Sequence, residues 1–109
     1  MRTVMVRYKV KPDRAVENEE LVRAVYDELR RTEPSGLRYA TFQLDDGVSF
    51  IHIALETAEG HSPLPHVKAF KEFQKNIGER CDEAPVVNEL RAIGAFHLFG
   101  AESERTRTV

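Results

Sequence analysis

The sequence contains no tryptophan, a single cysteine and no long apolar run. Because Cys81 has no second cysteine to pair with, a disulfide within the chain is excluded and a reducing cytoplasm is the expected location. No stretch approaches the roughly 20 apolar residues that a membrane-spanning helix needs. Lys and Arg nowhere form a dense block, which argues against nucleic acid or an anionic membrane as the main partner.

The composition that remains is typical of one globular domain. The chain has 109 residues, of which 41% are hydrophobic and 31% charged, and its formal net charge is −2. We expect a single domain over residues 1–99. Residues 100–109 offer almost nothing apolar to bury and are expected to form a disordered tail.

Alternation and helical periodicity predict six elements. A strand is expected over 3–11 and a helix over 14–32, whose apolar stripe contains Leu21, Val22, Val25, Tyr26 and Leu29. Strands over 37–44 and 48–56 flank Asp45-Asp46-Gly47, a sequence that favours a hairpin turn. A second helix over 65–81, a connector over 82–85 and a last strand over 86–99 complete the pattern.

The order β-α-β-β-α-β predicts a ferredoxin-like α+β fold, in which both helices cover one face of a four-stranded antiparallel sheet. Neither face of the strand over 48–56 is polar. We expect Phe50, His52 and Ala54 on the face away from the helices. Since that face would otherwise expose a large apolar patch, two copies are expected to pack sheet to sheet as a homodimer.

Two histidines mark the entry into the second helix, within His61-Ser62-Pro63-Leu64-Pro65-His66. His66 is the best single catalytic candidate. It is four residues before Phe70 and is expected to face the sheet as a neutral imidazole that could accept a proton. A half-buried histidine at the helix start is the competing interpretation. His61 is a weaker candidate for a pocket contact, since a solvated loop histidine is the favoured interpretation.

Aromatic residues are the remaining candidates for a small-molecule pocket, around which Tyr8, Tyr26 and Tyr39 could place their hydroxyls. Tyr8 and Tyr26 lie on the expected apolar faces of the first strand and helix, and Phe70 and Phe73 lie on the side of the second helix that begins at His66. Tyrosines in such positions are more often core residues with one satisfied hydroxyl.

No metal site is expected, because His61 and His66 miss the i,i+4 spacing and no cysteine pair accompanies them. His52 and His97 are expected to make hydrogen bonds at the dimer interface, and the sequence assigns them no further role.

The β-α-β-β-α-β order, together with His61-x4-His66 and His66-Val67-Lys68-Ala69-Phe70, resembles the antibiotic biosynthesis monooxygenase-like domains of the dimeric α/β-barrel superfamily. The resemblance implies a homodimer with a ligand pocket between sheet and helices in each subunit. It also implies a cofactor-independent monooxygenase acting on an aromatic or quinol-like substrate, with His66 as base. The substrate anion would itself reduce O2.

Two alternatives stay open. Some catalytic members carry a pocket tryptophan that this chain lacks, and the approach to His61 over Thr57-Ala58-Glu59-Gly60 is short. A non-catalytic ligand-binding or dimerisation module therefore competes with the oxygenase. Degradative or isomerising enzymes of the same superfamily also use a lone histidine in a similar pocket.

Overall fold

The computed structural model describes residues 2–56 and 62–98, and the predictions for His61 and for the tail over 100–109 lie outside this part. Its elements in chain order are β1 (Arg2–Val10), the 3-10 turn η1 (Pro12–Arg14), α1 (Ala15–Thr32), β2 (Leu37–Gln43), β3 (Ser49–Glu56), the 3-10 turn η2 (Leu64–His66), α2 (Lys68–Gln74), α3 (Ile77–Arg80) and β4 (Cys81–Leu90). None of the helices in these ranges has the length and apolarity needed to cross a membrane.

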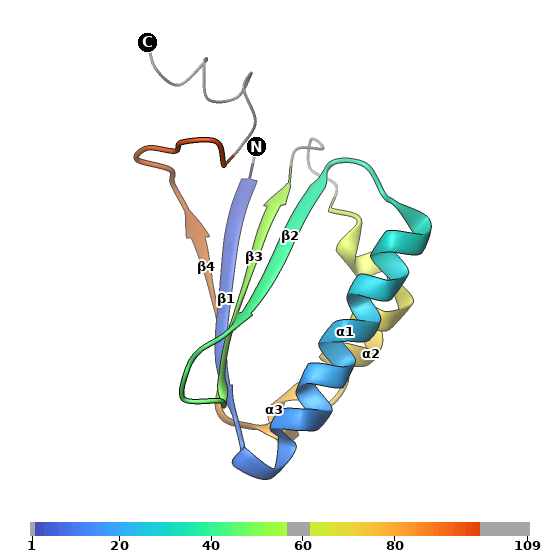
Figure 1. Ribbon diagram of the computed structural model, residues 1–109, viewed down its shortest axis with the longest axis vertical. Helices are drawn as coiled ribbons and strands as arrows, with labels where there is room; N and C mark the ends of the chain where they lie inside the picture. The colour runs from blue at the N-terminus through green and yellow to red at the C-terminus, as the bar shows by residue number, and fades with distance from the viewer. Residues whose placement is uncertain (1, 57–61, 99–109) are drawn as a thin grey trace.

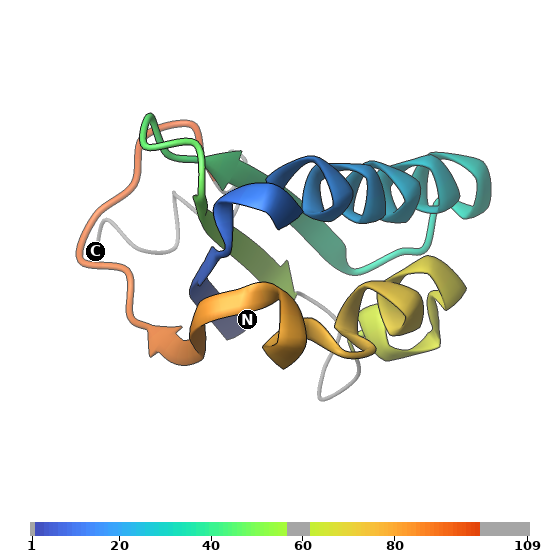
Figure 2. The ribbon, with the colours of Figure 1, turned by 90° about the horizontal axis from the view of Figure 1, so that it is seen from below.

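The strands form one antiparallel sheet in the order β2-β3-β1-β4. The helices pack on one face of this sheet (Figures 1 and 2). The ferredoxin-like α+β prediction is confirmed. The hairpin between β2 and β3 is also confirmed: Gly47 adopts a φ of +78°, and the Asp46 carboxylate accepts the backbone N–H groups of Val48 and Ser49.

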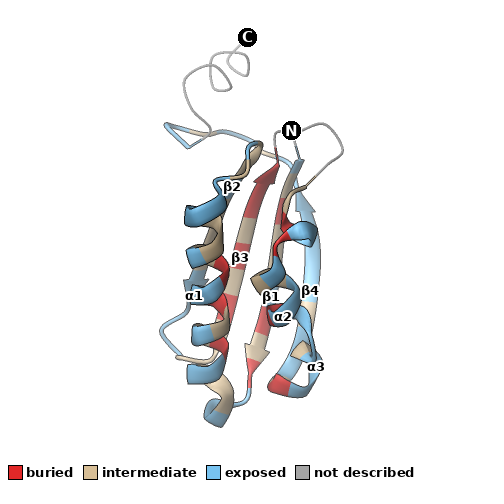
Figure 3. Ribbon diagram, turned by 90° about the vertical axis from the view of Figure 1, so that its right-hand side faces the viewer, coloured by how far each residue is buried: buried red, intermediate tan, exposed pale blue. Residues whose placement is uncertain are grey.

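The core lies between the sheet and α1 (Figure 3), where Val22 and Val25 are buried as the periodicity predicts. Tyr8 in β1 pairs with Phe50 in β3, so both side chains point toward the helices. His52 and Ala54 share that face. The prediction that placed Phe50, His52 and Ala54 on the opposite face is therefore wrong. Because both faces of β3 are apolar, its sequence shows which side chains share a face but not which of the two faces packs against the helices.

The second helix is shorter than the predicted 65–81 and is interrupted twice. Val67 is extended between η2 and α2, and extended Lys75 and left-handed Asn76 separate α2 from α3. Leu64 and Val67 are three residues apart and both point into the protein, which leaves His66 exposed. The expected orientation of His66 toward the sheet is wrong, because Val67 occupies the inward position.

The last strand begins earlier than predicted. β4 covers Cys81–Leu90, including the expected connector over 82–85, and residues 91–98 form no strand. Pro85 is compatible with this assignment because β4 is an edge strand, which leaves one side without a ladder. Residues 91–98 cross the side of the sheet away from the helices (Figure 2), and His97 is exposed there.

A carboxylate from α1 holds the start of α2. Glu28 accepts the backbone N–H groups of Lys68 and Ala69 at 3.0 and 2.9 Å. These bonds satisfy donors that the first helical turn leaves free, and the hydrogen bond from Ala69 is the main reason that the pKa of Glu28 is lowered. Glu28 thereby fixes α2 over the sheet.

We expect Glu28→Ala to lower the melting temperature and to increase amide exchange in α2. Because the pKa of Glu28 is lower in the folded state, its contribution is present above the pKa of the unfolded chain and is lost as pH falls through the folded value. Thermal unfolding at neutral and acidic pH checks this. Glu20→Ala, at an exposed position of the same helix, is the matched control, and an equal effect of both variants would contradict the prediction.

Candidate functional site

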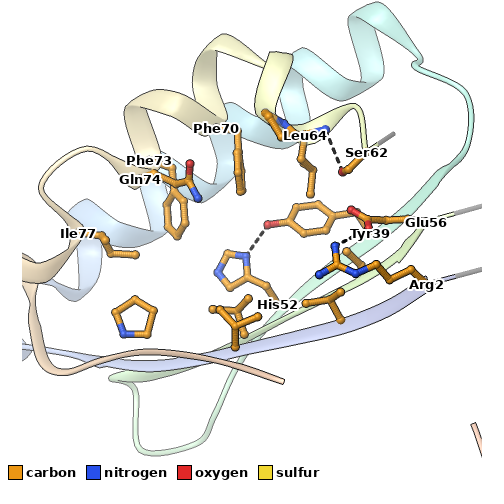
Figure 4. A pocket seen from close by; sticks show the side chains of 16 residues that line it. Arg2, Tyr39, His52, Glu56, Ser62, Leu64, Phe70, Phe73, Gln74 and Ile77 are labelled. Carbon is orange, nitrogen blue, oxygen red and sulfur yellow. Dashed lines mark hydrogen bonds and ion pairs between the residues drawn. The ribbon is translucent and has the colours of Figure 1, made fainter. Parts of the chain in front are cut away.

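A cavity of about 420 Å³ lies between the sheet and α2 (Figure 4). Apolar side chains make up most of its wall. They come from β1, β3 and β4 on one side and from η2, α2 and α3 on the other: Val4, Val6, Ala54, Leu64, Pro65, Phe70, Phe73, Ile77, Pro85 and Val87. At one end, Arg2 and Glu56 form an ion pair at 3.2 Å. The size and lining are typical of a small-molecule site.

Tyr39 and His52 place a pair of hydrogen-bonded side chains within the apolar part of the wall. The Tyr39 hydroxyl lies 2.6 Å from His52 Nδ1, and Thr41 Oγ1 lies 3.1 Å from the same atom. The hairpin places Thr41 directly opposite His52 in neighbouring strands, and Tyr39 comes two residues before Thr41 on the same face. Phe73 packs against the imidazole, with ring centroids 5.1 Å apart.

A chain of buried polar groups continues behind His52. Its Nε2 lies 2.8 Å from the Tyr8 hydroxyl, which accepts a hydrogen bond from Asn18 Nδ2 at 2.8 Å. Asn18 Oδ1 in turn accepts from the Arg80 guanidinium, whose Nε and Nη2 both lie 3.3 Å away. Asn18 is fully buried and Arg80 is 2% exposed. The chain therefore connects a buried cation to the cavity.

Burial determines which of these groups are charged. It lowers the pKa of His52 to about 4, so the imidazole is neutral at physiological pH. It also raises the pKa values of Tyr8 and Tyr39 well above the usual range, so both phenols keep their protons. The site thus presents neutral hydrogen-bonding groups next to an apolar cavity.

We expect acid to destabilise the protein through His52. The pKa of His52 is about 4 in the folded protein and 6.5 for an exposed histidine, as in the unfolded chain. The contribution of neutral His52 to the free energy of unfolding is therefore complete above pH 6.5 and is lost as the pH falls toward 4. The loss should reach about 3 kcal/mol of unfolding free energy. Urea unfolding between pH 7 and pH 4 checks this. His52→Gln should show a correspondingly smaller loss, and parallel curves for the two proteins would contradict it.

The predicted site residues are only partly brought together. Phe70 and Phe73 line the cavity, and their contact with a substrate stays a prediction. Tyr8 lies behind the wall and touches His52, while Tyr26 bonds Thr41 at 2.8 Å and stacks on Tyr39 outside the cavity. His66 is exposed and is not part of the wall, so its catalytic role stays a prediction without support from this geometry.

Sequence reasoning named Tyr39 only as one of three tyrosines whose hydroxyls could lie around a pocket, and it missed Asn18 and Arg80 as site residues. A signal for Asn18 was present, because it precedes Val22 by one turn and interrupts the apolar stripe of α1 with an amide. The hairpin turn also indicated that Thr41 would lie opposite His52. Arg80 carried no signal, since the predicted helix over 65–81 concealed the break before α3. Among the described residues, no three metal-ligating side chains cluster.

The chain matches no protein-family model, and a search of curated proteins also finds no match. Its fold resembles solved structures. A crystal structure of an antibiotic biosynthesis monooxygenase is 21% identical, covering 85% of this chain and 99% of that chain, with a TM-score of 0.69.

Two further structures show how differently such relatives are described. A variant of SnoaB, a cofactor-independent oxygenase from Streptomyces nogalater, is 16% identical over 86% of this chain and 94% of that chain, with a TM-score of 0.61. A protein of unknown function from Nitrosomonas europaea is 13% identical over 91% of this chain and 95% of that chain, with a TM-score of 0.69. The chain therefore has the ferredoxin-like α+β fold of the antibiotic biosynthesis monooxygenase-like proteins.

Proposed function

We propose that this protein is a cofactor-independent monooxygenase that oxidises an aromatic or quinol-like hydroxyl compound in the cavity between the sheet and α2. The observation that carries the proposal is the Tyr39–His52 pair, at 2.6 Å, in a mostly apolar wall. An aromatic ring in this cavity would lie beside Phe70, with its oxygen directed toward the polar pair. A cavity of about 420 Å³ suits a few fused rings.

The chemistry requires little from the protein beyond this environment. The ionised substrate passes one electron to O2, and the substrate radical and superoxide combine to a peroxide at carbon. The O–O bond then breaks: the oxygen that stays on carbon becomes a carbonyl. The other oxygen leaves as water with the hydrogen of that carbon and the proton released when the substrate ionised. The Tyr39 hydroxyl, held by His52, orients the substrate oxygen, and the apolar wall limits the access of bulk water to the intermediate.

Oxygen consumption over a panel of hydroquinones and anthrones tests the proposal. Turnover well above the rate without protein, with a carbonyl product and one water per O2, is the expected result. Tight binding of these compounds without turnover would instead identify a ligand-binding module. The absence of both binding and turnover would overturn the proposed function.

We further propose that the protein acts as a cytoplasmic homodimer. The side of the sheet away from the helices carries Met5, Ile51, Ile53 and Leu55 rather than the set expected from sequence. Large apolar side chains remain exposed at its edges and on the segment that crosses it, namely Phe42, Val86, Ile93, Phe96 and Leu98. Two such faces packed together would cover these side chains, with residues 91–98 of one copy against the other.

We expect Ile53→Glu to convert the dimer into single chains, with a rise of about 10²-fold in the dissociation constant, because a carboxylate would be buried in an apolar interface. Size-exclusion chromatography with light scattering measures this. Val16→Glu, at a position of α1 that is 72% exposed, is the matched control. A single-chain mass for the unmodified protein at micromolar concentration would contradict the homodimer.

A further inference from the structure

In the chain of hydrogen bonds from Arg80 to Tyr39, Arg80 fixes which group of each pair is the donor. Arg80 is only a donor, so the Asn18 atom facing it must be the carbonyl oxygen, and the amide NH2 must face Tyr8. The Tyr8 oxygen therefore accepts from Asn18. Its own proton can then be donated to His52 Nε2, which lies 2.8 Å away.

The same reasoning assigns the proton on His52. The His52 imidazole is neutral, and its Nε2 accepts a hydrogen bond from Tyr8. Its proton is therefore on Nδ1. Nδ1–H then donates toward the oxygens of Tyr39 and Thr41. Because the Tyr39 oxygen is an acceptor in this bond, its own O–H proton is left to point into the cavity that Tyr39 lines.

We infer that the cavity binds its ligand as an oxyanion, an ionised phenol or enol, through the Tyr39 hydroxyl. The buried charge of Arg80 acts on this hydroxyl through Asn18, Tyr8 and His52: it orients the O–H group and makes it a stronger hydrogen-bond donor. This inference rests on the proposed function, whose substrate class it narrows. It also assigns the site a means of generating the reactive form, because stabilising the anion lowers the pKa of the bound hydroxyl.

The surroundings of Arg80, the source of the positive charge, support a chain that donates its hydrogen bonds toward the cavity. Arg80 is 2% exposed and forms no ion pair within the described ranges 2–56 and 62–98. Its other hydrogen bonds go to the carbonyl oxygens of Phe73 and Lys75, at 2.7 and 3.2 Å. A buried cation held only by neutral groups polarises the chain toward the cavity, since each donor in the chain strengthens the next.

The charged and titratable groups around Tyr39 and His52 do not oppose an anion. β1 contributes Tyr8, and α1 contributes Tyr26, both neutral phenols. The Glu56 carboxylate at the end of the cavity is compensated by Arg2. From α2, the apolar side chains of Phe70 and Phe73 face the cavity together with the neutral amide of Gln74.

Asn18→Asp would reverse the donor and acceptor roles in the hydrogen bonds between Tyr8, His52 and Tyr39. A carboxylate at this position can still accept from Arg80, but it can only accept from Tyr8, so the Tyr8 proton would turn away from His52. Nε2–H would then donate to Tyr8, and Nδ1 would accept from Tyr39. The Tyr39 oxygen would face the cavity as an acceptor, and the anion preference would be lost together with the isolated positive charge.

Two measurements test the inference. The first is nitrogen NMR of the imidazole without ligand, which should find His52 protonated on Nδ1 in the unmodified protein and on Nε2 in Asn18→Asp. The second is titration with 4-nitrophenol, whose ionised form absorbs visible light. The unmodified protein should bind the phenolate at least tenfold more tightly than the phenol, and Asn18→Asp should lose this preference. Asn76→Asp, the same substitution at an exposed site near Arg80, should change neither.

Each outcome of these measurements decides the inference. Protonation on Nε2 in the unmodified protein, or equal or tighter binding of the neutral phenol, would overturn it while leaving the proposed function intact. Failure of both forms to bind would overturn the inference and count against the proposed function as well. Should Asn18→Asp not fold, the NMR and binding measurements on the unmodified protein still decide between the two directions.

Discussion

Replacing Tyr39 by Phe should slow oxygen consumption by about 10²–10³-fold, the usual loss when one donor to a developing oxyanion is removed. The hydroxyl is the only group lost, and the ring can keep its stacking on Tyr26 at a centroid distance of 5.4 Å. The fold should therefore survive, and the defect should appear in kcat and in the affinity for 4-nitrophenolate. Steady-state oxygen uptake and equilibrium binding measure the two effects separately.

Two further variants make this result specific. Tyr26→Phe removes a tyrosine hydroxyl that bonds Thr41 outside the cavity, and it should cost far less activity than Tyr39→Phe. His66→Ala tests the catalytic role predicted from sequence for an exposed side chain. If His66→Ala slowed the reaction as much as Tyr39→Phe, the catalytic assignment to the Tyr39–His52 pair would be wrong.

Arg80→Met should produce the largest loss of stability, about 3 kcal/mol or more, because it leaves several buried acceptors without donors. These acceptors are Asn18 Oδ1 and the carbonyl oxygens of Phe73 and Lys75. Methionine keeps much of the apolar stem, so the loss reports the guanidinium rather than a cavity. At a typical urea dependence the unfolding midpoint should fall by about 1–3 M.

The control for this variant is Arg23→Met. Arg23 pairs with Glu19 at 3.2 Å on the exposed side of α1, and its side chain is 73% exposed, so its removal should change the midpoint very little. Arg80→Lys should fall between the two, because one ammonium cannot reproduce the planar arrangement of guanidinium donors. A midpoint for Arg80→Met within error of the unmodified protein would show that Arg80 is dispensable for stability.

The sequence predicted the fold well because period and turn chemistry are local signals. Alternation in β1, the stripe of α1 and the Asp46-Gly47 step each restrict the backbone without reference to distant residues. The face of β3 was different. Phe50 and Ile51 are equally apolar, so only the pairing of β3 with β1 decides which of them meets the helices. The sequence places His52 at an interface for this reason, although its side chain is part of the cavity wall.

The site was harder to predict because its polar chain joins residues from separate elements. Asn18, Tyr8, His52 and Tyr39 come from α1, β1, β3 and β2, and each has an ordinary structural explanation when considered alone. His66 was favoured because a continuous helix would have turned it inward. The extended conformation of Val67 prevents this, and nothing in the local pattern distinguishes Val67 from a helical residue.

The two sides of the cavity are built from different parts of the chain, and this separates two properties on which selection can act. The polar groups Tyr39 and His52 belong to the sheet, whereas Phe70 and Phe73 belong to α2, a seven-residue helix bounded by the non-helical residues Val67 and Lys75. Substitutions within α2 can therefore alter the size and shape of accepted ligands while the hydrogen-bonding groups stay in place. New substrate ranges could arise, by evolution or by design, through changes in one short segment of this scaffold.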